Sequence, residues 1–224
     1  MKKSQLVFVP GPGMGHIVSA VEFSKILINH HVHLSVTVLV IKGPFDPNVD
    51  AYIHSITSSL SFPERLHFTL LPPHPDPTKL QTLQPSSFMD SLIKNQIQNV
   101  RDAVSKLNSA SDSHPLAGFL VDMFCTAMID VANEFGVPAM VFFTSGAGFL
   151  GFKIHLHTLW EQENVDMTEL SWEDSGIEFA IPSYENPVPV SVFPSVTLDK
   201  EWASQPFEED KESKGHNSEY SRGA

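Results

Sequence analysis

Two residues, His16 and Asp122, have the types and positions needed for acid–base chemistry. His16 follows "VFVPGPGMG", an apolar run and a glycine-rich turn, and stands where a helix is expected to begin. A helix N-terminus disfavours imidazolium, so the ring is expected to be neutral and able to accept a proton. Asp122 ends the apolar run "PLAGFLVD" and could orient the ring and stabilise imidazolium as it forms. The two residues predict a general base with its orienting acid.

Each residue also has a simpler interpretation. A single histidine is more often an ordinary surface or core residue, and Asp122 could equally cap a helix beginning in "MFCTAMID". A protein nucleophile is not evident, because Ser145 lies outside a G-x-S-x-G motif and Cys125 is expected to be a buried structural thiol. A His–Asp pair without a nucleophile suits deprotonation of a substrate hydroxyl.

The glycine-rich turn allows a different hypothesis, a nucleotide-binding oxidoreductase. Gly11, Gly13 and Gly15 partly match the dinucleotide pattern G-x-G-x-x-G, but its third glycine would fall on His16. A Gly-Lys-Ser/Thr sequence does not follow, which excludes a Walker loop. The turn is therefore interpreted as a tight strand-to-helix connection, and the oxidoreductase ranks low.

The elements that must position these residues alternate between strand and helix. Alternation of this kind predicts an α/β fold, a Rossmann-like parallel sheet with helices on both faces. Strands are expected at residues 5–10, 34–41, 65–71, 115–122 and 138–144, and helices from residue 16 and at 48–60, 86–109 and 126–136 and near residue 146. The first and fourth strands should be neighbours, which would bring Asp122 to His16. Residues 72–78 and most of the chain after Glu161 are expected to lack regular structure, because prolines interrupt them.

Composition narrows the class of protein. The 224 residues carry 14 basic and 26 acidic side chains, a net charge of −12 that argues against a nucleic-acid partner. A single cysteine excludes an intrachain disulfide. The apolar run near the N-terminus is too short for a secretory signal, and a transmembrane segment is not expected. These features predict a cytoplasmic protein.

Three blocks of sequence, in order, resemble one family. "VFVPGPGMGHIVSAVEFSKIL", "FLVDMFCTAMIDVANEFGVPAMVFFTSGAGFLG" and "IPSYENPVPVSVFPS" resemble the N-terminal domain of plant UDP-dependent glycosyltransferases, closest to the flavonoid and small-phenol glucosyltransferases. The resemblance extends from Ser4 to Trp202. It implies half of a GT-B architecture, in which the N-terminal domain holds the acceptor and the C-terminal domain holds the UDP-sugar.

The resemblance also implies roles for individual residues. His16 would be the catalytic base, Asp122 its activating acid, and Thr144 a contact of the donor sugar. Gly15, Phe88 and Phe124 would line the acceptor pocket. The partner would be a small hydrophobic acceptor with a hydroxyl group, with UDP-sugar as co-substrate once a C-terminal domain is supplied. A metal or other cofactor is not expected.

The chain departs from the family pattern near its end. Residues 1–202 are expected to form the acceptor-binding domain, and residues 203–224 read as a divergent, disordered tail. The family's donor box is missing from the sequence, so the chain is expected to be truncated and weakly active or inactive alone. A frameshifted or mis-spliced continuation is one hypothesis for the tail. The alternative function is a non-catalytic module that binds the acceptor or a partner.

Overall fold

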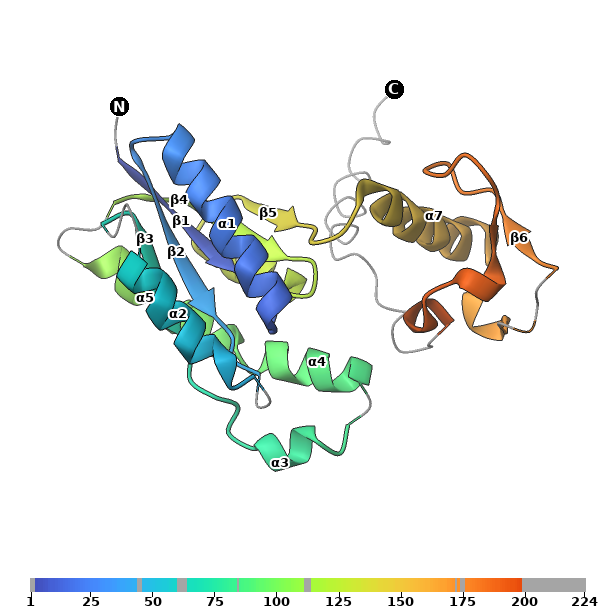
Figure 1. Cartoon of the computed structure of the whole chain (residues 1–224), viewed down its shortest axis with the longest axis horizontal. Coiled ribbons are helices and arrows are strands. Elements are labelled where there is room, and N and C mark those ends of the chain that lie inside the picture. The colour runs from blue at the N-terminus through green and yellow to red at the C-terminus, as the bar shows by residue number, and fades with distance from the viewer. Residues whose placement is uncertain are drawn as a thin grey trace, which may run out of the picture. The chain divides into compact units, whose positions relative to one another are not determined.

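The computed structural model describes residues 3–43, 46–59, 64–83, 85–110, 114–171, 173 and 176–198 (Figure 1). The predicted tail at 203–224 lies outside the described residues. The chain divides into two compact units, Met1–Thr144 and Ser145–Ala224. The assignment of residues 1–202 to one acceptor-binding domain stays a prediction.

Unit 1 is built on a five-stranded parallel sheet in the order β3-β2-β1-β4-β5 (Figure 1). Its strands are β1 (Ser4–Val9), β2 (Leu34–Val40), β3 (Leu66–Leu70), β4 (Leu116–Asp122) and β5 (Ala139–Phe142). The predicted parallel α/β fold is confirmed, and so is the adjacency of the first and fourth strands, where Val9 pairs with Val121.

Helices cover both faces of the sheet, which is why its central strands are apolar on both sides. The helices of unit 1 are α1 (Met14–His30), α2 (Asn48–Ser59), α3 (Pro77–Leu80), α4 (Pro85–Lys94), α5 (Ile97–Ser109) and α6 (Ile129–Glu134). Phe8 of β1 packs with Ile17 and other residues of α1 and α2 on one face. Val7 and Val9 pack on the opposite face with residues of α4, α5 and α6.

The single helix predicted over residues 86–109 is wrong, because the structure breaks it into α4 and α5. Gln96 lies at the break and is almost fully buried. Its side-chain amide donates to the carbonyl of Pro72 at 3.0 Å and accepts from Asn99 at 2.9 Å. This buried amide anchors the proline-rich segment, whose last residues also form the short helix α3 rather than loop alone.

Unit 2 packs a long helix against short elements and has its own core. It contains α7 (Ala147–Glu163), the strands β6 (Glu178–Phe179) and β7 (Val188–Pro189), and the short 3-10 helices Met167–Glu169, Val190–Val192 and Ser195–Leu198. β6 and β7 pair antiparallel, so the expectation of little regular structure after Glu161 was only partly correct. Phe152, Leu156 and Phe193 are among the residues of this core.

Gly151 lets the segment around Ser183 lie directly on α7. A Cβ atom at Gly151 would lie 2.5 Å from Ser183 Cβ, whereas one at Gly148 would lie an ordinary 3.6 Å from the Tyr184 ring. Ser183 Oγ also donates to the carbonyl of Gly148 at 2.8 Å. The close approach of the Ser183 side chain to the backbone of α7 therefore requires glycine at position 151, whereas position 148 has room for alanine.

This pair of glycines predicts opposite effects of the same substitution. Gly151→Ala should lower the free energy of unfolding by about 1–3 kcal/mol through overpacking. Gly148→Ala should leave it unchanged or raise it by roughly 0.5–1 kcal/mol, because alanine is the better helix former. Urea denaturation of both variants measures this difference, and equal midpoints for the two would contradict the contact.

Lys153 of α7 predicts a pH-dependent stability. Burial lowers the pKa of Lys153 to about 7, below the ordinary value of about 10.4 expected in the unfolded chain. Between these values the unfolded chain binds more protons, so this group makes stability rise with pH. Lys153→Met should raise the melting temperature most at pH 7 and progressively less towards pH 10. An equal rise in melting temperature at pH 7 and at pH 10 would contradict the lowered pKa of Lys153.

Candidate functional site

The turn between β1 and α1 brings His16 to the carboxyl edge of the sheet. Gly13 has φ of 114°, a conformation that favours glycine, and it precedes the helix at the capping position. The apolar pattern predicts that the helix begins at His16. In the structure it begins at Met14, so His16 is its third residue. His16 therefore stays within the first turn, where backbone N–H groups lack helical partners.

Asp122 is the last residue of β4 and is fully buried. Its Oδ1 accepts the backbone N–H of Phe124 at 3.0 Å, and its carbonyl accepts the N–H of Cys125 at 2.7 Å. Oδ1 of Asp122 therefore bonds a local turn. The alternative interpretation of Asp122 as a helix cap is wrong, because Cys125 precedes the 3-10 helix Thr126–Met128 and no side chain among the described residues caps that helix. The other oxygen, Oδ2, faces His16 and Thr144.

The structure brings His16 and Asp122 together across the two adjacent strands. His16 Nδ1 lies 2.8 Å from Asp122 Oδ2. A carboxylate only accepts hydrogen bonds, so Nδ1 carries the proton and Nε2 is left as the basic nitrogen. The side chain of His16 is 24% exposed, against 1% for Asp122. A partly exposed imidazole oriented by a buried carboxylate can accept a proton from a bound hydroxyl.

Thr144 also reaches this pair. It follows β5, whose last residue, Phe142, is paired in register with Asp122. Thr144 Oγ1 lies 3.0 Å from His16 Nδ1 and 3.3 Å from Asp122 Oδ2. The sequence placed Thr144 at the same sheet edge but did not predict a hydrogen bond to the pair.

Two of the glycines in the turn have different surroundings. A Cβ atom at Gly11 would lie 2.8 Å from Asp122 Oδ1 and 3.2 Å from His16 Nδ1, so the bare backbone of Gly11 leaves room for the pair. Gly15 is exposed, and nothing lies within 4 Å of the position its Cβ would occupy. Gly15 therefore leaves open space beside the first turn of α1.

Of the two aromatic residues predicted for the acceptor pocket, Phe124 contacts the pair. Its ring lies edge-on to that of His16, with centroids 5.2 Å apart. Phe88 lies on α4 and packs, half buried, against the core cluster that contains Val121 and Cys125. That Phe88 and Phe124 line an acceptor pocket stays a prediction.

Cys125 is unsuited to nucleophilic chemistry. It is fully buried, and its thiol donates to the carbonyl of Pro10 at 3.6 Å. Burial, with a further contribution from the charge of Asp122, raises the pKa of the Cys125 thiol well above its ordinary value. Within the described ranges, no group of three or more His, Cys, Asp or Glu side chains is arranged to hold a metal ion.

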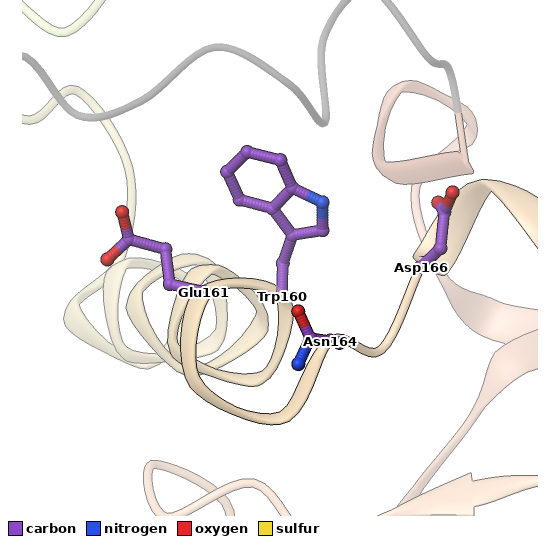
Figure 2. Close-up of a pocket in the computed structure, with 4 residues that line it drawn as sticks. All are labelled: Trp160, Glu161, Asn164 and Asp166. Atoms are coloured by element: carbon purple, nitrogen blue, oxygen red, sulfur yellow. The ribbon is translucent and has the colours of Figure 1, made fainter.

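Unit 2 contains a pocket of about 390 Å³ at the end of α7 (Figure 2). Of the residues that the structure describes, those that line it are Trp160, Glu161, Asn164 and Asp166. Asn164 ends α7 in a left-handed conformation, and Asp166 Oδ1 accepts the N–H and hydroxyl of Thr168 at 2.8 and 2.7 Å. Asn164 and Asp166 thus terminate or cap helices, and none of the predicted site residues is among the described residues that line this pocket.

Comparison with known proteins identifies the family, although no protein-family model matches the chain. UDP-glucose flavonoid 3-O-glucosyltransferase 6 of Fragaria ananassa is 42% identical over 204 residues, which cover 89% of this chain and 41% of that protein. UDP-glycosyltransferase 71E1 of Stevia rebaudiana is 41% identical over 219 residues, which cover 96% and 44%. The chain belongs to the plant UDP-glycosyltransferase family.

Solved structures of plant UDP-glycosyltransferases share the fold. A transferase from Siraitia grosvenorii in complex with UDP matches with a TM-score of 0.73 and 40% identity, over 90% of this chain and 40% of that one. Medicago truncatula UGT71G1 complexed with UDP-glucose matches with a TM-score of 0.73 and 33% identity, over 89% and 41%. This chain therefore spans about two fifths of the length of its relatives.

None of the helices in the described ranges is long and apolar enough to cross a bilayer.

Proposed function

We propose that the chain forms the acceptor side of an inverting sugar transfer from a UDP-sugar, with His16 as the base and Asp122 as its orienting acid. The observation that carries the proposal is the 2.8 Å contact between His16 Nδ1 and the buried Asp122 carboxylate, which leaves Nε2 as the basic nitrogen. Family membership supplies the reaction class, because the relatives are named UDP-glycosyltransferases.

The proposed step moves one proton and exchanges one bond. His16 Nε2 accepts the proton of the acceptor hydroxyl, and the oxygen attacks the anomeric carbon of the sugar. The attack comes from the side opposite the diphosphate. The bond between the anomeric carbon and the diphosphate breaks, UDP leaves, and the configuration at that carbon inverts. Asp122 stabilises the imidazolium that forms. In this proposal the UDP-sugar is a co-substrate, and neither a metal nor another cofactor takes part.

The substrates follow from the relatives and from the aromatic edge beside His16. The Fragaria ananassa relative is named for UDP-glucose and a flavonoid, and a Medicago truncatula relative was solved with UDP-glucose. Phe124 places an aromatic ring against the base, a surface that suits a flat, hydrophobic, hydroxylated acceptor. We therefore propose glucosyl or hexosyl transfer to a small flavonoid, phenolic or terpenoid hydroxyl. Action in the cytoplasm stays a prediction.

A second candidate is a non-catalytic module that binds the acceptor or a partner. The chain matches about two fifths of each relative, and we propose that the remainder of those proteins holds the UDP-sugar. Differential stabilisation of the leaving diphosphate would then come mainly from that remainder. By this account residues 1–202 bind acceptor, and the chain alone transfers little or no sugar.

One experiment separates the two candidates. The chain, and a chimera joining residues 1–202 to the C-terminal remainder of the Fragaria ananassa relative, are each assayed for UDP release from UDP-glucose with a flavonol. The acceptor is also titrated calorimetrically into the chain. Flavonol-dependent transfer by the chimera that His16→Gln abolishes supports the enzyme, and acceptor binding without transfer supports the module. Transfer that is indifferent to His16→Gln would refute His16 as the base.

A further inference from the structure

The hydroxyl of Thr144 closes a triangle of hydrogen-bonding atoms with the His–Asp pair. Thr144 Oγ1 lies 3.0 Å from His16 Nδ1 and 3.3 Å from Asp122 Oδ2, and those two atoms are 2.8 Å apart. The contact is built by the sheet, because β5 pairs with β4 and carries Thr144 past its end to the side of Asp122.

The positions of the protons in this triangle follow from its chemistry. The Asp122 carboxylate can only accept, so it receives the Nδ1–H of His16 and the O–H of Thr144 at the same oxygen. The Thr144 oxygen then turns a lone pair to the Nδ1–H of His16. With its other oxygen bound by the N–H of Phe124, the buried carboxylate has a donor on each side.

We propose that Thr144 is a positioning residue for the His16–Asp122 pair. Its hydroxyl holds the imidazole in the Nδ1–H tautomer and against the carboxylate, and Nε2 is therefore left for the acceptor. The catalytic meaning of this contact rests on the proposed function, since positioning matters only if His16 is the base.

The same contact limits what Thr144 can do for a donor sugar. A hydroxyl has one proton, and here that proton is directed to Asp122 Oδ2. While the triangle persists, Thr144 can meet a sugar hydroxyl only as an acceptor. The contact with the donor sugar stays a prediction, in which the Thr144 oxygen would accept from a sugar hydroxyl.

The test is the exchange of the His16 Nδ1 proton with water, followed by nuclear magnetic resonance on the full ¹⁵N-labelled chain without ligand. The His16 resonance is assigned by its loss in His16→Gln. Thr144→Val keeps the shape of the side chain and removes the hydroxyl, whereas Thr144→Ser keeps the hydroxyl. Loss of one hydrogen bond should speed the exchange by about fivefold in Thr144→Val, and Thr144→Ser should restore the slow rate.

Thr144→Ala is measured alongside, so the result does not depend on how well valine fits. Faster exchange in the valine or alanine variant, with recovery in the serine variant, supports the positioning role even if the chain transfers no sugar. Unchanged exchange in the variants without the hydroxyl would overturn it, and so would fast exchange in Thr144→Ser. Both results are independent of the transfer assay, so failure of the proposed function and failure of this inference are distinguishable.

Discussion

His16→Gln is expected to lower glucosyl transfer by the chimera by about 10⁴-fold, the upper end of what a general base contributes. Glutamine keeps a side chain of similar reach but cannot accept the acceptor's proton. The turnover that remains should rise with pH as the acceptor ionises without help. The initial rate of UDP release, measured from pH 6 to pH 9, tests both expectations.

A matched control lies on the same helix. His30 is exposed in the last turn of α1, and His30→Gln makes the same chemical change away from the pair. It should leave the rate within about twofold of the parent, as for an ordinary surface substitution. A similar loss in both variants would mean that the effect comes from α1 as a whole and not from the base.

Asp122→Asn is expected to lower the same rate by about 10³-fold, within the range of a general-base contribution. The amide is close in shape but presents N–H donors where the carboxylate accepts from His16 and Thr144. His16 would then accept at Nδ1 and carry its proton on Nε2, the wrong tautomer for a base. Initial rates and a circular dichroism melt of the variant separate lost catalysis from lost folding.

The control for this change is Asp130→Asn, at an exposed position in the first turn of α6. It should leave the rate unchanged, because Asp130 has no contact with the pair among the interactions of the described residues. An active Asp122→Asn variant would show that the carboxylate only shapes the turn after β4.

The features that the sequence could predict are those that depend on local pattern and on the rules of parallel sheets. Alternating strands and helices predicted the fold, and the adjacency of the first and fourth strands predicted that Asp122 would reach His16. Both follow from hydrophobic periodicity and from handedness, which every βαβ unit shares. The fold and the order of these strands could therefore be predicted without knowing any contact between individual side chains.

The features that the sequence could not predict depend on single contacts between distant segments. At the break between α4 and α5, the Gln96 amide bonds the carbonyl of Pro72, 24 positions earlier, whereas the amphipathic pattern runs straight through the break. The close contact at Gly151 requires Ser183, 32 positions later, to lie against α7. The hydroxyl of Thr144 bonds the pair only because β5 ends beside β4.

A double-mutant cycle in the chimera tests directly whether His16 and Asp122 act as one base. If the two residues act as one base, the double variant His16→Gln/Asp122→Asn loses about as much rate as His16→Gln alone, about 10⁴-fold. Independent roles would instead multiply the two losses to roughly 10⁷-fold. The first result is the one predicted by the 2.8 Å contact between His16 and Asp122. The second would contradict it.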